Sequence, residues 1–136
     1  YCVQGGYLLN KDENTIIFII PTWSEKNVII PDTITVIGEG AFSGIDIEQI
    51  TITNPHTVIE AFAFTNCANL THVFLPEQNN IVIKKRAFSY TTALVEISNL
   101  DQVLTVEEYA FANSGIKEVT IGSNATYGEG AFYNNW

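Results

Sequence analysis

The stretch IGEGAF at residues 37–42 recurs as YGEGAF at residues 127–132, ninety residues further along the chain. The dipeptide Ala-Phe recurs at a regular spacing between them, at residues 63–64, 87–88 and 110–111, and the steps between successive copies are 22, 24, 23 and 21 residues. A regular period of roughly 20 to 50 residues is the signature of a repeat architecture. GEGAF is therefore one element of a repeat, seen at its first and last copies.

A second motif begins five or six residues after each of the first four Phe residues. It reads IEQITI at 47–52, LTHVFLP at 70–76, LVEIS at 94–98 and IKEVTI at 116–121. Alternating apolar residues put their side chains on one face of a strand, so each copy predicts a short strand. Asn99 stands where the other copies have an aliphatic residue, and we expect its strand to be the weakest of the set. Pro is missing after the strands at Thr53, Asn99 and Gly122, which predicts different turns there.

One such repeat cannot bury its own apolar face, but stacked repeats can. The small Ala lets successive coils approach closely, and the Phe fills the space between them. We therefore expect a solenoid of about five coils of 21–24 residues. It should consist mostly of short parallel strands and turns with little helix.

The composition excludes several classes of function. Only six Lys and Arg residues face fifteen Asp and Glu residues, for a net charge of −9, which argues against nucleic acid as a partner. No apolar run approaches the ~20 residues of a membrane-spanning helix. The chain contains no Met and no signal peptide, which we interpret as the mark of a processed form or a fragment of a longer protein.

No residue pattern predicts catalysis, a cofactor or a metal site. Gly38-Glu39-Gly40 and its copy at 128–130 lack the Lys and the spacing of a phosphate-binding loop, so tight turns are expected. The two histidines, His56 and His72, stand at no motif spacing from a nucleophile. Glu107-Glu108 and the acidic stretch at 12–14 are interpreted as solvated turns. Cys2 and Cys67 do not fit a zinc spacing, and the apolar surroundings of Cys67 predict a buried free thiol.

Three stretches of the chain resemble a known family. AFTNCANLTHVFLP (63–76), IPDTITVIGEGAFSG (30–44) and AFANSGIKEVTIG (110–122) are similar to the BspA-like leucine-rich repeats, which occur in surface proteins of bacteria and some anaerobic protozoa. GGYLLNKDENTIIFIIP (5–21) resembles the hairpin-like segment that often precedes such repeats. The resemblance implies the leucine-rich-repeat solenoid of the α/β horseshoe class. We expect a single domain, with residues 1–27 as an N-terminal strand or hairpin segment capping the stack and residues 28–136 as the repeats, the last one incomplete.

The outward-facing positions of the predicted strands are the candidate ligand-binding residues, because repeat proteins use such stacked columns as extended binding faces. Phe74 is the candidate anchor, since aromatic residues dominate binding energy at interfaces. Single exposed apolar residues are also ordinary, which leaves a purely structural role open. The two columns read Gln49, His72, Glu96, Glu118 and Thr51, Phe74, Ser98, Thr120.

Two functional hypotheses follow. The first, which the resemblance implies, is a non-enzymatic protein-binding or adhesion module of a cell-surface or secreted protein, contacting host cells or extracellular matrix proteins such as fibronectin and fibrinogen. The second is a structural repeat segment that spaces or assembles a larger protein. The coil at Phe132 has no following strand before the chain stops at Trp136, so this hypothesis includes end-to-end self-association.

Overall fold

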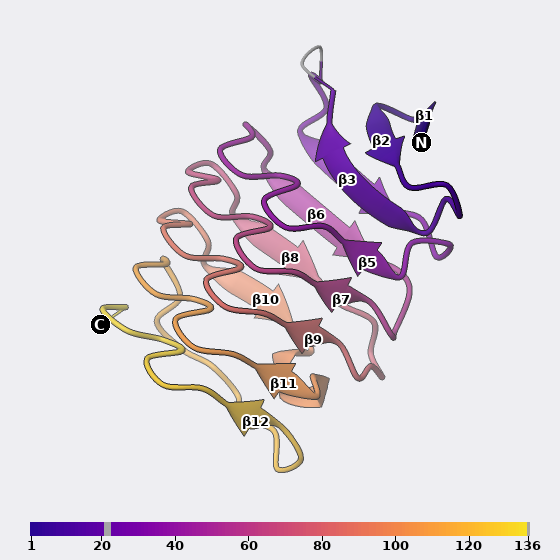
Figure 1. Cartoon of the computed structure of the whole chain (residues 1–136). Helices are drawn as coiled ribbons and strands as arrows, with labels where there is room; N and C mark the ends of the chain where they lie inside the picture. Colours follow the sequence, from indigo (N-terminus) through magenta and orange to yellow (C-terminus); the bar gives the residue numbers. More distant parts are fainter. Residues whose placement is uncertain (21–22, 136) are drawn as a thin grey trace.

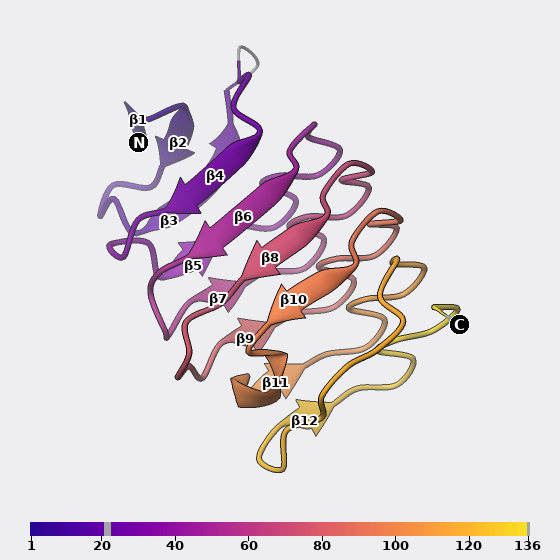
Figure 2. The same cartoon turned by 180° about the vertical axis from the view of Figure 1, so that it is seen from behind.

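The computed structural model describes residues 1–20 and 23–135. The chain winds into a solenoid with two sheets, which lie on opposite sides of the coils (Figures 1 and 2). Among these described residues, sheet A has eight strands: β1 (Cys2–Gln4), β2 (Tyr7–Leu9), β3 (Thr15–Ile19), β5 (Val36–Ile37), β7 (Val58–Ile59), β9 (Val82–Ile83), β11 (Thr105–Val106) and β12 (Thr126–Tyr127). Sheet B has four strands in the same part of the chain: β4 (Asn27–Ile30), β6 (Gln49–Ile52), β8 (His72–Phe74) and β10 (Glu96–Ser98).

The predicted architecture of about five coils with little helix is confirmed. In the described ranges, the one helical element is a 3₁₀ turn, η1 (Leu100–Gln102). From β3 onward, strands of successive coils pair in parallel within each sheet, as stacked repeats do. The first strands differ, because β1 pairs antiparallel with β2, and β2 antiparallel with β3.

The Ala-Phe turns form a third ladder of hydrogen bonds along one side of the solenoid, between β5 and β6 and at the matching place in later coils (left in Figure 1). The Phe amide N–H of one coil donates to the Ala carbonyl oxygen of the next at 2.7 Å, from Phe42 to Ala63 and in the three following pairs. The residue before each Ala and the second residue after each Phe have a left-handed backbone, with φ between 55° and 70°. This alternation points every second N–H toward the next coil.

The conformation of these turns explains why GEGAF occurs twice. A Cβ on Gly38 would lie 2.5 Å from the carbonyl oxygen of Ile16, so the first glycine is needed for close approach of two coils. Gly40 has open space around it but a φ of +65°, so the second glycine is needed for its backbone. The GEG segment is a tight turn, as expected.

The Phe residues of the turns stack into a continuous column inside the solenoid. Ring centroids are 4.9 Å apart for Phe42–Phe64 and for Phe64–Phe88, and 5.1 Å apart for Phe88–Phe111. These four side chains are fully buried. At the N-terminal end, the Tyr7 ring packs edge-on against Phe42, with 6.2 Å between centroids. The prediction that Phe fills the space between coils is confirmed.

Two of the strand predictions fail. Residues 116–121 form no strand, although their pattern matches the other copies. The strand that precedes Asn99 does form, since β10 pairs in register with β8, so the expectation that it would be the weakest is wrong. Asn99 adopts a left-handed backbone, donates its side-chain N–H to the Leu75 carbonyl oxygen at 2.8 Å and begins η1. The chain then leaves the strand path before it reaches the next coil.

Turns without Pro differ from those with Pro, as expected. Pro31 comes directly after β4, and Pro76 comes two residues after the end of β8. Thr53 stands one coil after Pro31, and its hydroxyl donates to the Ile30 carbonyl oxygen at 2.7 Å. The Asn99 side chain likewise bonds to the carbonyl oxygen of Leu75, which precedes Pro76 as Ile30 precedes Pro31. In both coils a polar side chain satisfies a carbonyl of the coil before it.

We predict that Phe88→Ala lowers the free energy of unfolding by about 3–5 kcal/mol, because it opens a cavity in the middle of the ring column. Urea denaturation followed by circular dichroism measures this. Phe18→Ala is the control, since Phe18 is 45% exposed, and it should cost below about 1 kcal/mol. Equal losses for the two variants would contradict the role given to the column.

Candidate functional site

The outward residues of sheet B align across four coils. Gln49 lies beside His72, which lies beside Glu96, and Thr51, Phe74 and Ser98 align in the same way. The parallel register therefore brings six of the eight predicted site residues together into two columns. We call these columns, together with Asn27 and Ile29 of β4, the strand face.

The residues of β4 were missed in the sequence. Asn27 pairs with Gln49 and Ile29 with Thr51, so each column begins one coil earlier than expected. Ile29 is 67% exposed, while Val28 and Ile30 on either side of it are buried. The signal was present, because NVIIP at 27–31 has the same apolar alternation and closing Pro as the later strands. Ile29 is the most exposed apolar side chain of the strand face.

Phe74 is half-buried rather than freely exposed. Its ring stacks on the imidazole of His72, with 6.0 Å between centroids and 11° between planes. The Nδ1 atom of His72 lies 2.9 Å from the Thr71 hydroxyl, and its Nε2 atom lies 3.7 Å from a carboxylate oxygen of Glu96. The centre of the strand face is therefore a packed aromatic pair bordered by a carboxylate.

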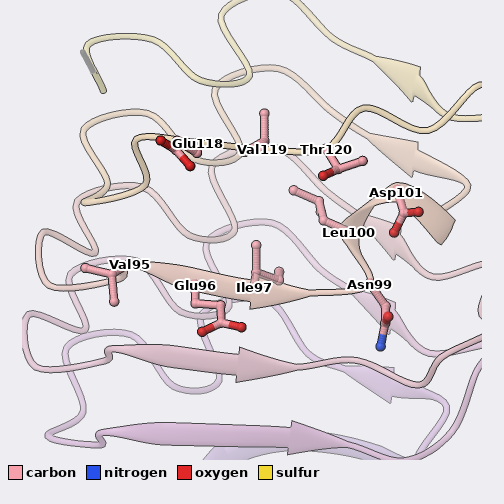
Figure 3. A pocket seen from close by; sticks show the side chains of 9 residues that line it. All are labelled: Val95, Glu96, Ile97, Asn99, Leu100, Asp101, Glu118, Val119 and Thr120. Carbon is pink, nitrogen blue, oxygen red and sulfur yellow. The ribbon is translucent and has the colours of Figure 1, made fainter.

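The last members of the two predicted columns, Glu118 and Thr120, do not join the sheet. They lie across a groove from β10, and Leu100 lies between Thr120 and the end of the strand (Figure 3). Leu100 is only 4% exposed, so η1 packs an apolar side chain into the space beside the end of β10, where the ladder would continue. The groove has a volume of about 170 Å³. Its lining residues are Val95, Glu96, Ile97, Asn99, Leu100, Asp101, Glu118, Val119 and Thr120.

The remaining polar candidates have structural partners. Glu107 accepts a hydrogen bond from the Lys85 amide at 2.9 Å and lies 3.7 Å from the Lys84 ammonium group. Glu108 lies 3.0 Å from the ammonium group of Lys85. Within residues 1–20 and 23–135, no group of three His, Cys, Asp or Glu side chains is close enough to hold a metal ion.

Both cysteines are free thiols, and Cys67 is buried as predicted. Its thiol donates to the Phe42 carbonyl oxygen at 3.0 Å. Burial removes water from the thiol and raises the pKa of Cys67 from 9.0 to about 12.

We predict that this pKa makes the protein less stable at alkaline pH. The folded state keeps the Cys67 proton up to a pKa of about 12, while the unfolded chain loses it above 9.0, so stability is lost as the pH rises between these values. Unfolding in urea should need about 1 kcal/mol less at pH 10 than at pH 8 from this group. In Cys67→Ala the decrease should be smaller by that amount. An identical pH dependence in the variant would contradict the assignment.

Comparison with known proteins identifies the repeat. The model of the BspA type leucine rich repeat region matches residues 21–136, in six copies. This chain belongs to the BspA-type leucine-rich repeat family. The resemblance seen in the sequence is thereby confirmed. Among curated proteins, no relative matches the chain.

Two solved structures share the fold. A leucine-rich repeat protein from Bacteroides ovatus is 21% identical, with a TM-score of 0.58 over 81% of this chain and 35% of its own. A leucine rich cell surface protein from Faecalibacterium prausnitzii is 21% identical, with a TM-score of 0.53 over 93% of this chain and 50% of its own. This BspA-type chain thus spans between a third and a half of these proteins. In the part of it that the structure describes, no helix is long and apolar enough to cross a lipid bilayer.

Proposed function

We propose that this chain is a non-enzymatic protein-binding module of a cell-surface or secreted protein, and that it contacts host cells or extracellular matrix proteins through the strand face. The observation that carries the proposal is the alignment of outward side chains across four coils, which joins exposed Ile29 to the His72–Phe74 pair. An apolar and aromatic centre with a polar rim is the usual anatomy of a protein interface.

The family and the structural neighbours support this proposal. Leucine-rich repeats generally mediate protein interactions, and one of the two similar solved structures is described as a cell surface protein. The groove that borders the strand face has a volume of about 170 Å³, below the roughly 300–1,000 Å³ of small-molecule pockets, so a protein partner suits this face better.

The test is binding of the purified chain to immobilised fibronectin, to fibrinogen and to epithelial cells. We expect saturable binding that Ile29→Ser and Phe74→Ser each weaken by about tenfold or more, since both remove apolar contact from the centre of the strand face. Leu104→Ser is the matched control, because Leu104 is an exposed apolar residue outside sheet B, and it should bind as the wild type does.

Two results would contradict the proposal. Binding that is equal in all four proteins would move the interface away from the strand face. Absence of binding to every preparation at micromolar concentration would favour the second candidate function, a structural segment that spaces or assembles a larger protein and associates end to end. That candidate is supported by the greater length of the two structural neighbours.

A further inference from the structure

The two left-handed positions of each Ala-Phe turn carry different residues in different coils. Gly and Asn adopt this backbone at least cost, whereas a bulky side chain strains it. The position before Ala reads Gly40, Phe62, Arg86, Tyr109 and Gly130, and the second position after Phe reads Gly44, Asn66, Tyr90, Asn113 and Asn134. The middle coils therefore hold bulky residues where the repeat itself shows that Gly or Asn is sufficient.

Phe62, Arg86 and Tyr90 border a single groove on this side of the solenoid, with a volume of about 360 Å³. Thr65, Asn66 and Ser89 complete its lining. Phe62 is 37% exposed and Tyr90 is 49% exposed, so neither ring belongs to the buried core. Strained backbone that persists without a packing reason is typical of binding sites.

Arg86 supplies a positive charge in this groove. Its guanidinium group lies 4.8 Å above the centroid of the Tyr109 ring, which holds it in place. Lys84 and Lys85 are paired with Glu107 and Glu108, but across the described ranges no carboxylate lies within ion-pair distance of Arg86. In a chain of net charge −9, such a cation favours a ligand with a carboxylate group.

The buried hydroxyls and the backbone amides of the groove are already bonded. The hydroxyls of Thr65 and Ser89 lie 2.8 Å apart, and Ser89 also donates to the Arg86 carbonyl oxygen at 3.0 Å. The Asn66 and Tyr90 amides donate to carbonyl oxygens of the next coil at 3.0 and 2.9 Å. The groove thus offers no free strand edge for β-augmentation.

A polyproline II peptide needs no such edge, because its backbone forms no ladder of hydrogen bonds and its pyrrolidine rings pack on aromatic side chains. We propose that this groove docks an extended, proline-rich acidic peptide segment of a partner protein. A proline ring lies between Phe62 and Tyr90, and a neighbouring Asp or Glu carboxylate pairs with Arg86. The site lies on the Ala-Phe turns and is independent of the strand face.

The test is isothermal titration calorimetry of the whole chain with a capped synthetic peptide of Pro-Pro-Glu repeats. We expect saturable binding that weakens with salt. The same peptide with Gln in place of Glu, or with Ala in place of Pro, should bind about tenfold more weakly or not at all. An oligogalacturonate of matched charge serves as the acidic-glycan comparison.

Variants taken from the repeat itself provide the sharpest controls. Phe62→Gly and Tyr90→Asn install the residues that other coils carry at these positions, so both should fold, melt at the same or a higher temperature, and lose peptide binding by about tenfold or more. Arg86→Gln keeps both rings and should lose the preference for Glu over Gln. Phe74→Ser, on the strand face, should bind the peptide as the wild type does.

Four outcomes would overturn the proposal. They are no saturable binding of the Pro-Pro-Glu peptide, equal binding by Phe62→Gly and Tyr90→Asn, and binding of the oligogalacturonate in place of the peptide. The fourth is a lower melting temperature for both ring variants, which would show that the rings stabilise the turns instead of serving a ligand.

Discussion

The hydrogen bond from each Phe amide to the Ala carbonyl of the next coil is the interaction on which the rest of the structure depends. It is 2.7 Å long at all four junctions, and it holds the coils at the spacing where the buried Phe rings stack, about 5 Å apart. The strands are only two to five residues long and would be marginal by themselves. Because the Ala-Phe turns set the spacing, short strands on the other two sides fall into register.

This arrangement requires a left-handed backbone at two residues of each turn, which strains most side chains. In that conformation the amide N–H of each of these two residues points toward the next coil. Gly40 adopts this conformation without strain, whereas Phe62, Arg86 and Tyr90 adopt it with backbone strain. The repeat thus provides an internal comparison: wherever a costly residue stands at a position that is Gly or Asn elsewhere, its side chain rather than its backbone is the reason.

The spacing of Ala-Phe was enough to predict the solenoid, because a period of 21–24 residues leaves few other ways to bury one apolar face per repeat. The columns of the strand face were largely predictable for the same reason, since parallel register places equivalent residues side by side. Ile29 was missed because its coil carries no Ala-Phe upstream of it to mark the repeat, although its NVIIP stretch resembles the later strands.

The failure at residues 116–121 has a different cause. This stretch is as regular as the true strands, but whether a strand pairs depends on its neighbour. Asn99 turns the preceding chain away, and Leu100 fills the space where the ladder would continue. Likewise, the groove is lined by Phe62 and Tyr90, which are 28 positions apart and lie on successive turns. No local sequence pattern predicts that these two bulky side chains share a groove.

Native-state hydrogen exchange is the most direct test of the central role given to the turns. The account predicts that the amides of Phe42, Phe64, Phe88 and Phe111 are among the slowest to exchange and that they do so together, by opening of the whole stack. Amides of the short strands in sheet B should exchange no more slowly than these. Fast exchange of the four Phe amides, with sheet B still protected, would show that the strands hold the coils together and would contradict the account.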